Sequence, residues 1–126
     1  MKFYKCPICG NIIYIVEGND KLVKCCGQPL EELIPNTIDA ATEKHVPACK
    51  KEGENLVVTV GEVEHPMTSD HYIMFIAQVS GENINIKKLT PNDLPTATFP
   101  YIEKSTIYAY CNLHGLWSSE VEKLYN

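Results

Sequence analysis

Nine side chains in this sequence have the residue types and the spacing of metal ligands, and they fall into two groups. The first group consists of four cysteines arranged in two pairs: Cys6, Cys9, Cys25 and Cys26. A glycine follows each pair, at Gly10 and Gly27, which lets the backbone turn tightly so that its amides face the sulfurs. Four thiolates brought together in this way form a tetrahedral site that suits zinc or a single iron. The spacing alone does not separate the two metals.

Two disulfides are the alternative interpretation of these four cysteines. The sequence lacks the apolar core of a signal peptide near its start, and no apolar run approaches the roughly 18–20 residues of a membrane span. We therefore expect a soluble, cytoplasmic protein that makes no contact with a membrane, in a compartment that keeps thiols reduced. Adjacent cysteines such as Cys25 and Cys26 also pair with each other only under strain. A metal is the better cross-link.

The second group contains all four histidines and one further cysteine: His45, His65, His71, Cys111 and His114. Any one histidine alone is more often a surface residue or a hydrogen-bonded core residue than a ligand. The set is more informative than its members, because Cys111-x-x-His114 is a compact two-ligand loop. His65 and His71 bracket a second loop that is short enough to aim both rings at one point.

Five nitrogen and sulfur donors are more than tetrahedral zinc accepts, whereas iron readily takes five or six. An octahedral ion would keep one position open. A thiolate opposite that position pushes electron density toward whatever binds there, as the cysteine ligand of a haem oxygenase does. The second group therefore indicates chemistry on a small oxygen species.

The elements that must position the first group are short strands. We expect strands at 2–4 and 12–16, a hairpin turn at 17–20, a return strand at 21–24 and a linker at 30–36. The first domain, residues 1–36, is then below the roughly 40 residues that usually fold without a disulfide, a metal or a partner. It needs the metal as a cross-link.

Residues 37–126 are expected to form a second, mainly β domain that carries the histidines. Strands are predicted at 55–60, 72–79, 83–89 and 105–110, where apolar and polar residues alternate between glycines and prolines. This pattern is typical of a β-sandwich. The tail at 118–124 is expected to form a short helix.

The charge balance restricts the partners of this chain. Its net charge is −5, and all eleven basic residues are lysines, scattered along the sequence. Because arginine is the usual residue for gripping phosphate and guanine, nucleic acid is an unexpected partner. A small anionic substrate is repelled by the average field and needs a local positive group to attract it.

The two groups of ligands resemble those of the desulfoferrodoxin family, the two-iron form of superoxide reductase. The resemblance covers nearly the whole chain through motifs in the family's order: Cys6-x-x-Cys9, Cys25-Cys26, Glu43-Lys44-His45-Val46-Pro47, His65-Pro66-Met67, His71 and Cys111-Asn112-Leu113-His114-Gly115. It implies a desulforedoxin-like N-terminal domain with a rubredoxin-type iron on the four cysteines. It also implies an immunoglobulin-like β-sandwich with a second iron, bound equatorially by the four histidines and axially by Cys111.

The resemblance further implies an activity, which is the reduction of superoxide to hydrogen peroxide without release of dioxygen. Electrons would come from a rubredoxin-like donor, and the protein would be a homodimer with two iron ions per chain. The charge balance adds that Lys44, next to His45, is the local cation that attracts superoxide. Glu43 would supply a carboxylate to the open position once the iron is ferric. Cys49 matches no ligand position of the family and is interpreted as a free thiol.

A non-enzymatic module is the alternative function, in which both sites only transfer electrons or hold zinc. Five nitrogen and sulfur donors beside a lysine argue against it. Colour separates the two possibilities, because ferric iron bound to thiolates absorbs visible light and zinc does not. A visible spectrum with metal analysis, recorded before and after reduction by ascorbate, is the decisive observation.

Overall fold

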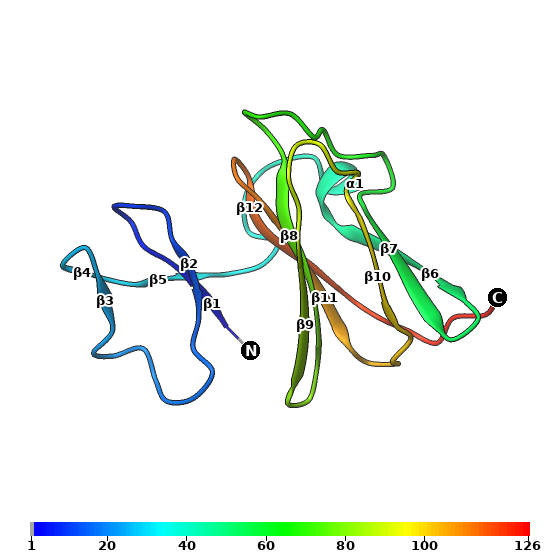
Figure 1. Cartoon of the computed structure of the whole chain (residues 1–126), viewed down its shortest axis with the longest axis horizontal. Helices are drawn as coiled ribbons and strands as arrows, with labels where there is room; N and C mark the ends of the chain where they lie inside the picture. The colour runs from blue at the N-terminus through cyan, green and yellow to red at the C-terminus, as the bar shows by residue number, and fades with distance from the viewer. Residues whose placement is uncertain (1) are drawn as a thin grey trace. The chain divides into compact units, whose positions relative to one another are not determined.

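A computed structural model describes residues 2–126 of the chain (Figure 1). It divides into two compact units, of which the first ends at Ile34 and the second is Pro35–Asn126. Both units consist of strands and turns, and the one helix among residues 2–126 is α1, Thr42–His45. No helix in this part of the chain is long and apolar enough to cross a membrane. The mainly β class that was predicted from the sequence is confirmed.

The first unit contains five short strands: β1 (Phe3–Lys5), β2 (Ile12–Tyr14), β3 (Lys24–Cys25), β4 (Gln28–Pro29) and β5 (Glu31–Leu33). The three longer strands form an antiparallel sheet in the order β2-β1-β5, and β3 pairs with β4 in a separate hairpin. Phe3, Tyr4 and Cys6 are its buried apolar side chains. So few buried side chains form too small a core to hold a unit of this length together alone.

Two sequence expectations for this unit were wrong. Residues 21–23 form a turn rather than a return strand, and β3 pairs with β4 instead of with β2. The stretch expected as a linker, 30–36, contains β5, which pairs with the free edge of β1. The proline and the charged residues of this stretch suggested a linker. Pairing with β5, however, provides hydrogen bonds for backbone N–H and C=O groups of β1 that would lack partners at an unpaired edge.

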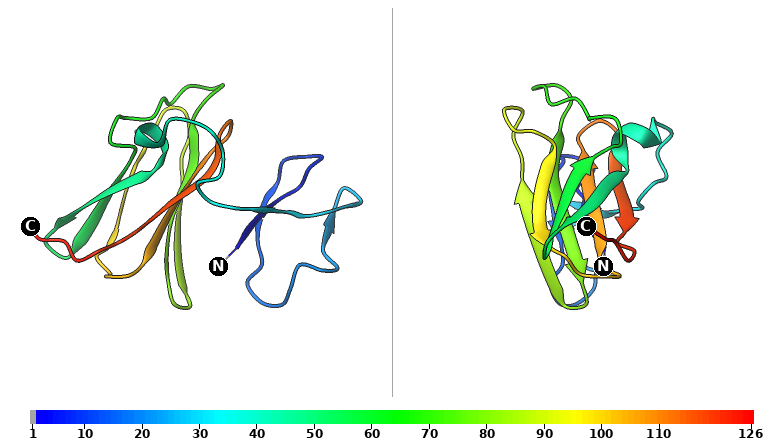
Figure 2. Two further views of the ribbon diagram at one scale, coloured as in Figure 1. Left: turned by 180° about the vertical axis from the view of Figure 1, so that it is seen from behind. Right: turned by 90° about the vertical axis from the view of Figure 1, so that its right-hand side faces the viewer.

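The second unit is a sandwich of two antiparallel sheets (Figure 2). One sheet has the order β10-β7-β6, from β6 (Pro47–Glu52), β7 (Asn55–Val60) and β10 (Thr96–Pro100). The other has the order β12-β11-β8-β9, from β8 (Ile73–Ser80), β9 (Asn83–Lys88), β11 (Thr106–Cys111) and β12 (Gly115–Glu120). Seven strands divided as three and four match the strand count of an immunoglobulin-like sandwich.

Alternating side chains of both sheets fill the core of the sandwich. Leu56, Val58 and Val60 point inward from β7, and Ile107 and Ala109 point inward from β11; all five are fully buried. Burying an aliphatic side chain contributes about 1.5–3 kcal/mol relative to exposing it. The sandwich therefore has a core of its own, in contrast to the first unit.

The tail expected as a helix at 118–124 is the end of a strand followed by irregular chain. β12 pairs with β11 over six residues, from Thr106 opposite Glu120 to Cys111 opposite Gly115. Ladder hydrogen bonds and the burial of Leu116 and Trp117 outweigh the local helix preference. β6 and β10 were also not predicted from the sequence.

Candidate metal centres

The four histidines come from three segments that gather at one end of the sandwich (Figure 1). His45 ends α1, His65 and His71 lie between β7 and β8, and His114 lies in the turn between β11 and β12. Their rings form a square. The four sides of this square join His45 to His65, His65 to His71, His71 to His114 and His114 to His45. The ring centroids along each side are 4.6–5.1 Å apart, with interplanar angles of 74–87°. The His45–His71 diagonal is 6.4 Å. A tetrahedron would make all of these separations equal.

Two of the rings are fixed so that the same nitrogen faces the middle of the square. Nδ1 of His45 lies 2.7 Å from the carbonyl oxygen of Ala41, and Nδ1 of His65 lies 2.7 Å from that of Pro66. Each Nδ1 therefore carries the proton and donates it, which leaves a lone pair on Nε2. These two Nε2 atoms are 3.2 Å apart, and Nδ1 of His114 is 3.1 Å from Nε2 of His45.

Lone pairs that face one another at this distance repel unless a cation lies between them. Nε2 of His71 is buried and has no hydrogen-bond partner, although buried polar atoms are almost always bonded. Nitrogens bound at about 2.1 Å and at a right angle to one another lie about 3 Å apart, near the observed spacing. The residues therefore fit a bound metal ion.

Cys111 joins the histidines through an irregularity in the sheet. Tyr110 pairs with Phe75 but Cys111 pairs with Ile73, so β8 has one extra residue and the register shifts at this point. Such bulges redirect side chains next to functional sites. The thiol is fully buried, and its Sγ lies 3.9 Å from Nδ1 of His114.

Four residues each place one donor atom within 4.8 Å of the donor atoms of the other three: His45, His71, Cys111 and His114. His65 does not belong to this set of four. Its ring nevertheless forms two sides of the square, and its Nε2 lies beside that of His45. We count it with the centre for this reason.

Burial prepares the histidines to act as neutral ligands. It lowers the pKa of His65 to about 4, and it is the largest cause that lowers the pKa values of His45 and His71. An unprotonated imidazole is the form that binds metal. Burial also raises the pKa of Cys111, partly opposed by backbone amides of Leu113 and His114. A metal cation favours the thiolate, so binding and deprotonation are coupled.

The four cysteines of the first unit also converge. Their sulfur atoms all lie within 4.8 Å of one another, and the six cysteines of the chain are free thiols. Backbone amides of Cys9 and Ile8 donate to Sγ of Cys6 at 3.4 Å and lower the pKa of that thiol. The neighbouring sulfurs of Cys6 and Cys9 raise the pKa of Cys25. A cation in the middle would relieve this crowding of sulfurs.

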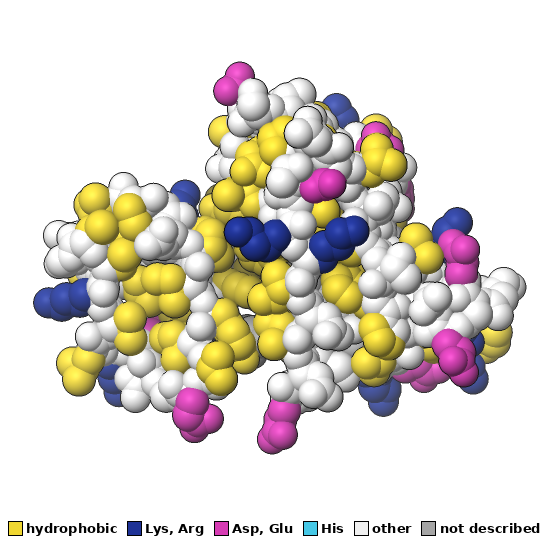
Figure 3. Space-filling model, viewed as in Figure 1, with side chains coloured by type: hydrophobic (Ala, Val, Ile, Leu, Met, Phe, Trp, Pro, Cys, Tyr) yellow, Lys and Arg dark blue, Asp and Glu magenta, His cyan; other side chains and the backbone are white. Residues whose placement is uncertain are grey.

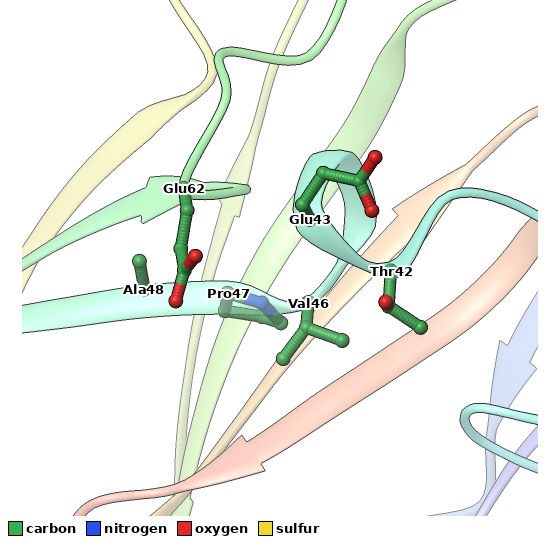
Figure 4. A pocket seen from close by; sticks show the side chains of 6 residues that line it. All are labelled: Thr42, Glu43, Val46, Pro47, Ala48 and Glu62. Carbon is green, nitrogen blue, oxygen red and sulfur yellow. The ribbon is translucent and has the colours of Figure 1, made fainter.

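Lys44 and Glu43 lie on α1 beside His45, and both are exposed. The charge of Lys44 contributes, after burial and the neighbouring imidazoles, to the lowered pKa values of His45 and His71. Lys44 therefore acts electrostatically on the histidine centre. Glu43 lines a pocket of about 250 Å³ together with Glu62, and no histidine lines that pocket (Figure 4). The pocket is thus not the metal centre.

Three residues near the histidines were not assigned a role from the sequence. Trp117 is buried and stacks on His45, with ring centroids 4.9 Å apart. Gly61 has a φ of +82° and lies against the backbone of Glu43 and Lys44. Asn112 bonds to both neighbours of His71. Only Asn112 had a signal in the sequence, because it lies inside the motif from Cys111 to Gly115.

Family models confirm the resemblance stated from the motifs. The model named desulfoferrodoxin matches residues 37–120, and the model of the desulfoferrodoxin N-terminal domain matches residues 1–33. This chain belongs to the desulfoferrodoxin family. A desulfoferrodoxin of Clostridium acetobutylicum is 45% identical over 112 residues, which are 89% of this chain and 90% of the relative.

Solved structures extend the family likeness to the fold. The crystal structure of the superoxide reductase from Treponema pallidum matches with a TM-score of 0.74 and 31% identity, covering 94% of this chain and 98% of that one. The one-iron superoxide reductase from Giardia intestinalis matches with a TM-score of 0.56 and 32% identity, covering 64% of this chain and 99% of that one. The first structure therefore shares the fold of nearly the whole chain, and the second shares the fold of about two thirds of it.

Proposed function

We propose that this protein is a superoxide reductase that converts superoxide to hydrogen peroxide at an iron held by its sandwich domain. The observation that carries the proposal is the convergence of four imidazoles and one thiolate at one end of the sandwich. We assign the ligands as His45, His65, His71, Cys111 and His114. Superoxide takes up one electron and two protons to give hydrogen peroxide. Iron held by these five residues would supply that electron when bound.

The protein residues set the conditions for that electron transfer. Cys111 would hold the ion together with the imidazoles, and its thiolate would donate electron density to it. Ring N–H bonds from His45 and His65 to backbone carbonyls hold these two rings in orientation. Superoxide would react at the bound ion, with water as the source of protons.

Lys44 and Glu43 have different roles in this proposal. Lys44 attracts superoxide to a chain whose average charge repels it. Its influence on the pKa values of His45 and His71 supports a place near the centre. Glu43 supplies a carboxylate after the electron has moved. Glu43 is exposed on α1, two residues before His45, which supports its assignment to this role.

The four cysteines Cys6, Cys9, Cys25 and Cys26 are assigned to a second iron that transfers electrons. We propose that a rubredoxin-like protein supplies those electrons. Cys9 and Cys26 are exposed, so a donor can approach these sulfurs closely. We also propose that the protein acts in the cytoplasm, where thiol ligands stay reduced.

A homodimer is the proposed assembly. Exposed apolar side chains of the first unit support it: Ile8 is 66%, Val16 81% and Leu22 92% exposed. Figure 3 shows apolar side chains on one face of this unit. The charged side chains in this view are scattered and form no continuous basic surface. Sedimentation or light scattering at micromolar concentration tests the assembly, and a monomer would contradict it.

The stoichiometry of the products tests the function. Reduction yields one hydrogen peroxide per superoxide and no dioxygen, whereas dismutation yields half as much peroxide together with dioxygen. The iron-loaded, pre-reduced protein should release one peroxide for each superoxide that it consumes, and no dioxygen. Cys111→Ser is the control, because iron can remain on the four histidines but loses the thiolate. Equal rates for this variant and the wild type in pulse radiolysis would contradict the role of Cys111.

A further inference from the structure

The side chain of Asn112 connects two of the three segments that supply the histidine centre. Its Oδ1 accepts a hydrogen bond from the backbone N–H of Tyr72 at 3.0 Å. Its Nδ2 donates to the carbonyl oxygen of Asp70, also at 3.0 Å. The backbone N–H of Asn112 donates to the carbonyl of Tyr72 at 3.2 Å. The carboxamide therefore holds the residue before and the residue after His71.

The position of the His71 ring depends on the loop that carries it. The rings of His45 and His65 are oriented by bonds from Nδ1 to backbone carbonyls, whereas the hydrogen bonds described for His71 involve its backbone. Hydrogen bonds between Thr68 and the backbone of His71 close a turn within the same loop. They do not join that loop to the strand that carries Cys111. The bonds of Asn112 do, because Asn112 directly follows Cys111.

We propose that Asn112 is a positioning residue that sets the place of the His71 ring relative to Cys111 in the metal centre. Because its one carboxamide bonds to both Asp70 and Tyr72, Asn112 fixes the position of the His71 loop relative to the end of β11. The inference rests on the proposed function only in taking iron as the bound ion. Asn112 itself contacts neither the metal nor the substrate in this proposal.

The test compares Asn112→Ala with Ser105→Ala in the full-length, iron-loaded protein. Ser105 is fully buried, donates from Oγ to the carbonyl of Ile102 at 2.6 Å, and lies at the opposite end of β11, roughly 20 Å from Cys111. Both variants lose side-chain hydrogen bonds, so both should melt at a lower temperature. Only Asn112→Ala should change the metal centre, because only Asn112 adjoins His71.

Iron affinity and electron paramagnetic resonance are the readouts. For Asn112→Ala we expect at least about a tenfold loss of iron affinity at the histidine centre in competition with a chelator. We also expect a changed ferric signal from that centre. The signal of the iron on the four cysteines should stay the same and is an internal control. Ser105→Ala should keep both signals and the wild-type affinity.

A second variant keeps the test decisive if Asn112→Ala does not fold. Asn112→Asp retains an acceptor for the N–H of Tyr72 and loses the donor to Asp70, so we expect a smaller loss of iron affinity in the same direction. Wild-type affinity and signal in either variant would overturn the proposal. A wild-type protein that fails to reduce superoxide, while Asn112→Ala still changes the iron signal, would overturn the function and leave the role of Asn112 supported.

Discussion

At the scale of single residues, proton positions and charges decide what the histidine centre does. The carbonyls of Ala41 and Pro66 hold protons on the outer nitrogens of His45 and His65, so the inner nitrogens are free to bind metal. In our proposal, Lys44 acts through its charge. Each of these effects can be tested by changing one side chain.

Replacement of Lys44 by alanine should slow the capture of superoxide by about tenfold. Attraction between unit charges at about 4 Å and an effective dielectric of 20 is about 4 kcal/mol, and salt screens it over about 8–10 Å. Pulse radiolysis at several ionic strengths should show a slower reaction with a flatter dependence on salt. Lys44→Arg should retain much of the rate. Lys123→Ala, which changes the net charge equally in the tail, should react as the wild type does; a similar loss there would contradict the assignment.

The thiol of Cys49 should be inert at neutral pH. Burial raises its pKa to about 11, opposed by a hydrogen bond with Ser119. Because the folded pKa of Cys49 exceeds the ordinary value of 9.0, the unfolded chain loses the thiol proton first as the pH rises. The contribution of the neutral thiol to the free energy of unfolding is therefore complete below about pH 9 and is lost between pH 9 and 11. Denaturant unfolding should show this decline, and Cys49→Ala should lack that part of it. Rapid alkylation of Cys49 in the folded protein at pH 8 would contradict the prediction.

At the scale of elements, the short helix α1 must be held against the end of β7 so that its side chains meet the centre. Val63 N–H donates to the carbonyl of Glu43 at 2.9 Å, and Gly61 N–H donates to that of Val46 at 3.2 Å. A Cβ on Gly61 would lie 2.7 Å from backbone atoms of Glu43 and Lys44. Only glycine allows this approach.

Gly61→Ala should therefore displace α1, in contrast to Gly81→Ala. Gly81 has a φ of +58°, but a Cβ at this position would meet no atom within 4 Å. Gly81→Ala therefore measures only the cost of placing alanine in a left-handed backbone conformation. We expect Gly61→Ala to lose about 1–3 kcal/mol more free energy of unfolding than Gly81→Ala, since overpacking forces the backbone to shift. The reaction with superoxide should slow only in Gly61→Ala. Equal losses of stability in the two variants would show that the close approach is unimportant.

At the scale of the whole molecule, the two units depend on metal to different degrees. The sandwich has its own apolar core, whereas the first unit buries few side chains and relies on its four sulfurs. The ligands of the two centres also come from different units. Loss of one centre should therefore leave the other in place.

Cys25→Ser should remove the iron of the first unit and make that unit sensitive to proteolysis. The histidine centre of the pre-reduced protein should still reduce superoxide at close to the wild-type rate, because its five ligands are untouched. Metal analysis, limited proteolysis and pulse radiolysis on one preparation measure all three effects. If the variant kept its histidine-bound iron but no longer reacted, the two centres would not be separable.

The sequence by itself determined the two donor groups and the mainly β class. Residue types and short spacings define the cysteine pairs and the Cys111 to His114 loop, and alternation of apolar residues defines strands such as 55–60. These features are local, so they can be read without knowing which segments meet. Family motifs added the expected pairing of each group with iron.

Only the tertiary structure decided how distant segments meet. The pairing of β5 with β1 and the bulge beside Cys111 depend on hydrogen bonds between segments far apart in the chain, and the tail continues as β12 because it pairs with β11 across a short turn. The square of imidazoles and the bonds of Asn112 to Asp70 and Tyr72 have the same origin. No local preference encodes such contacts, because their free energy appears only when both partners are brought together.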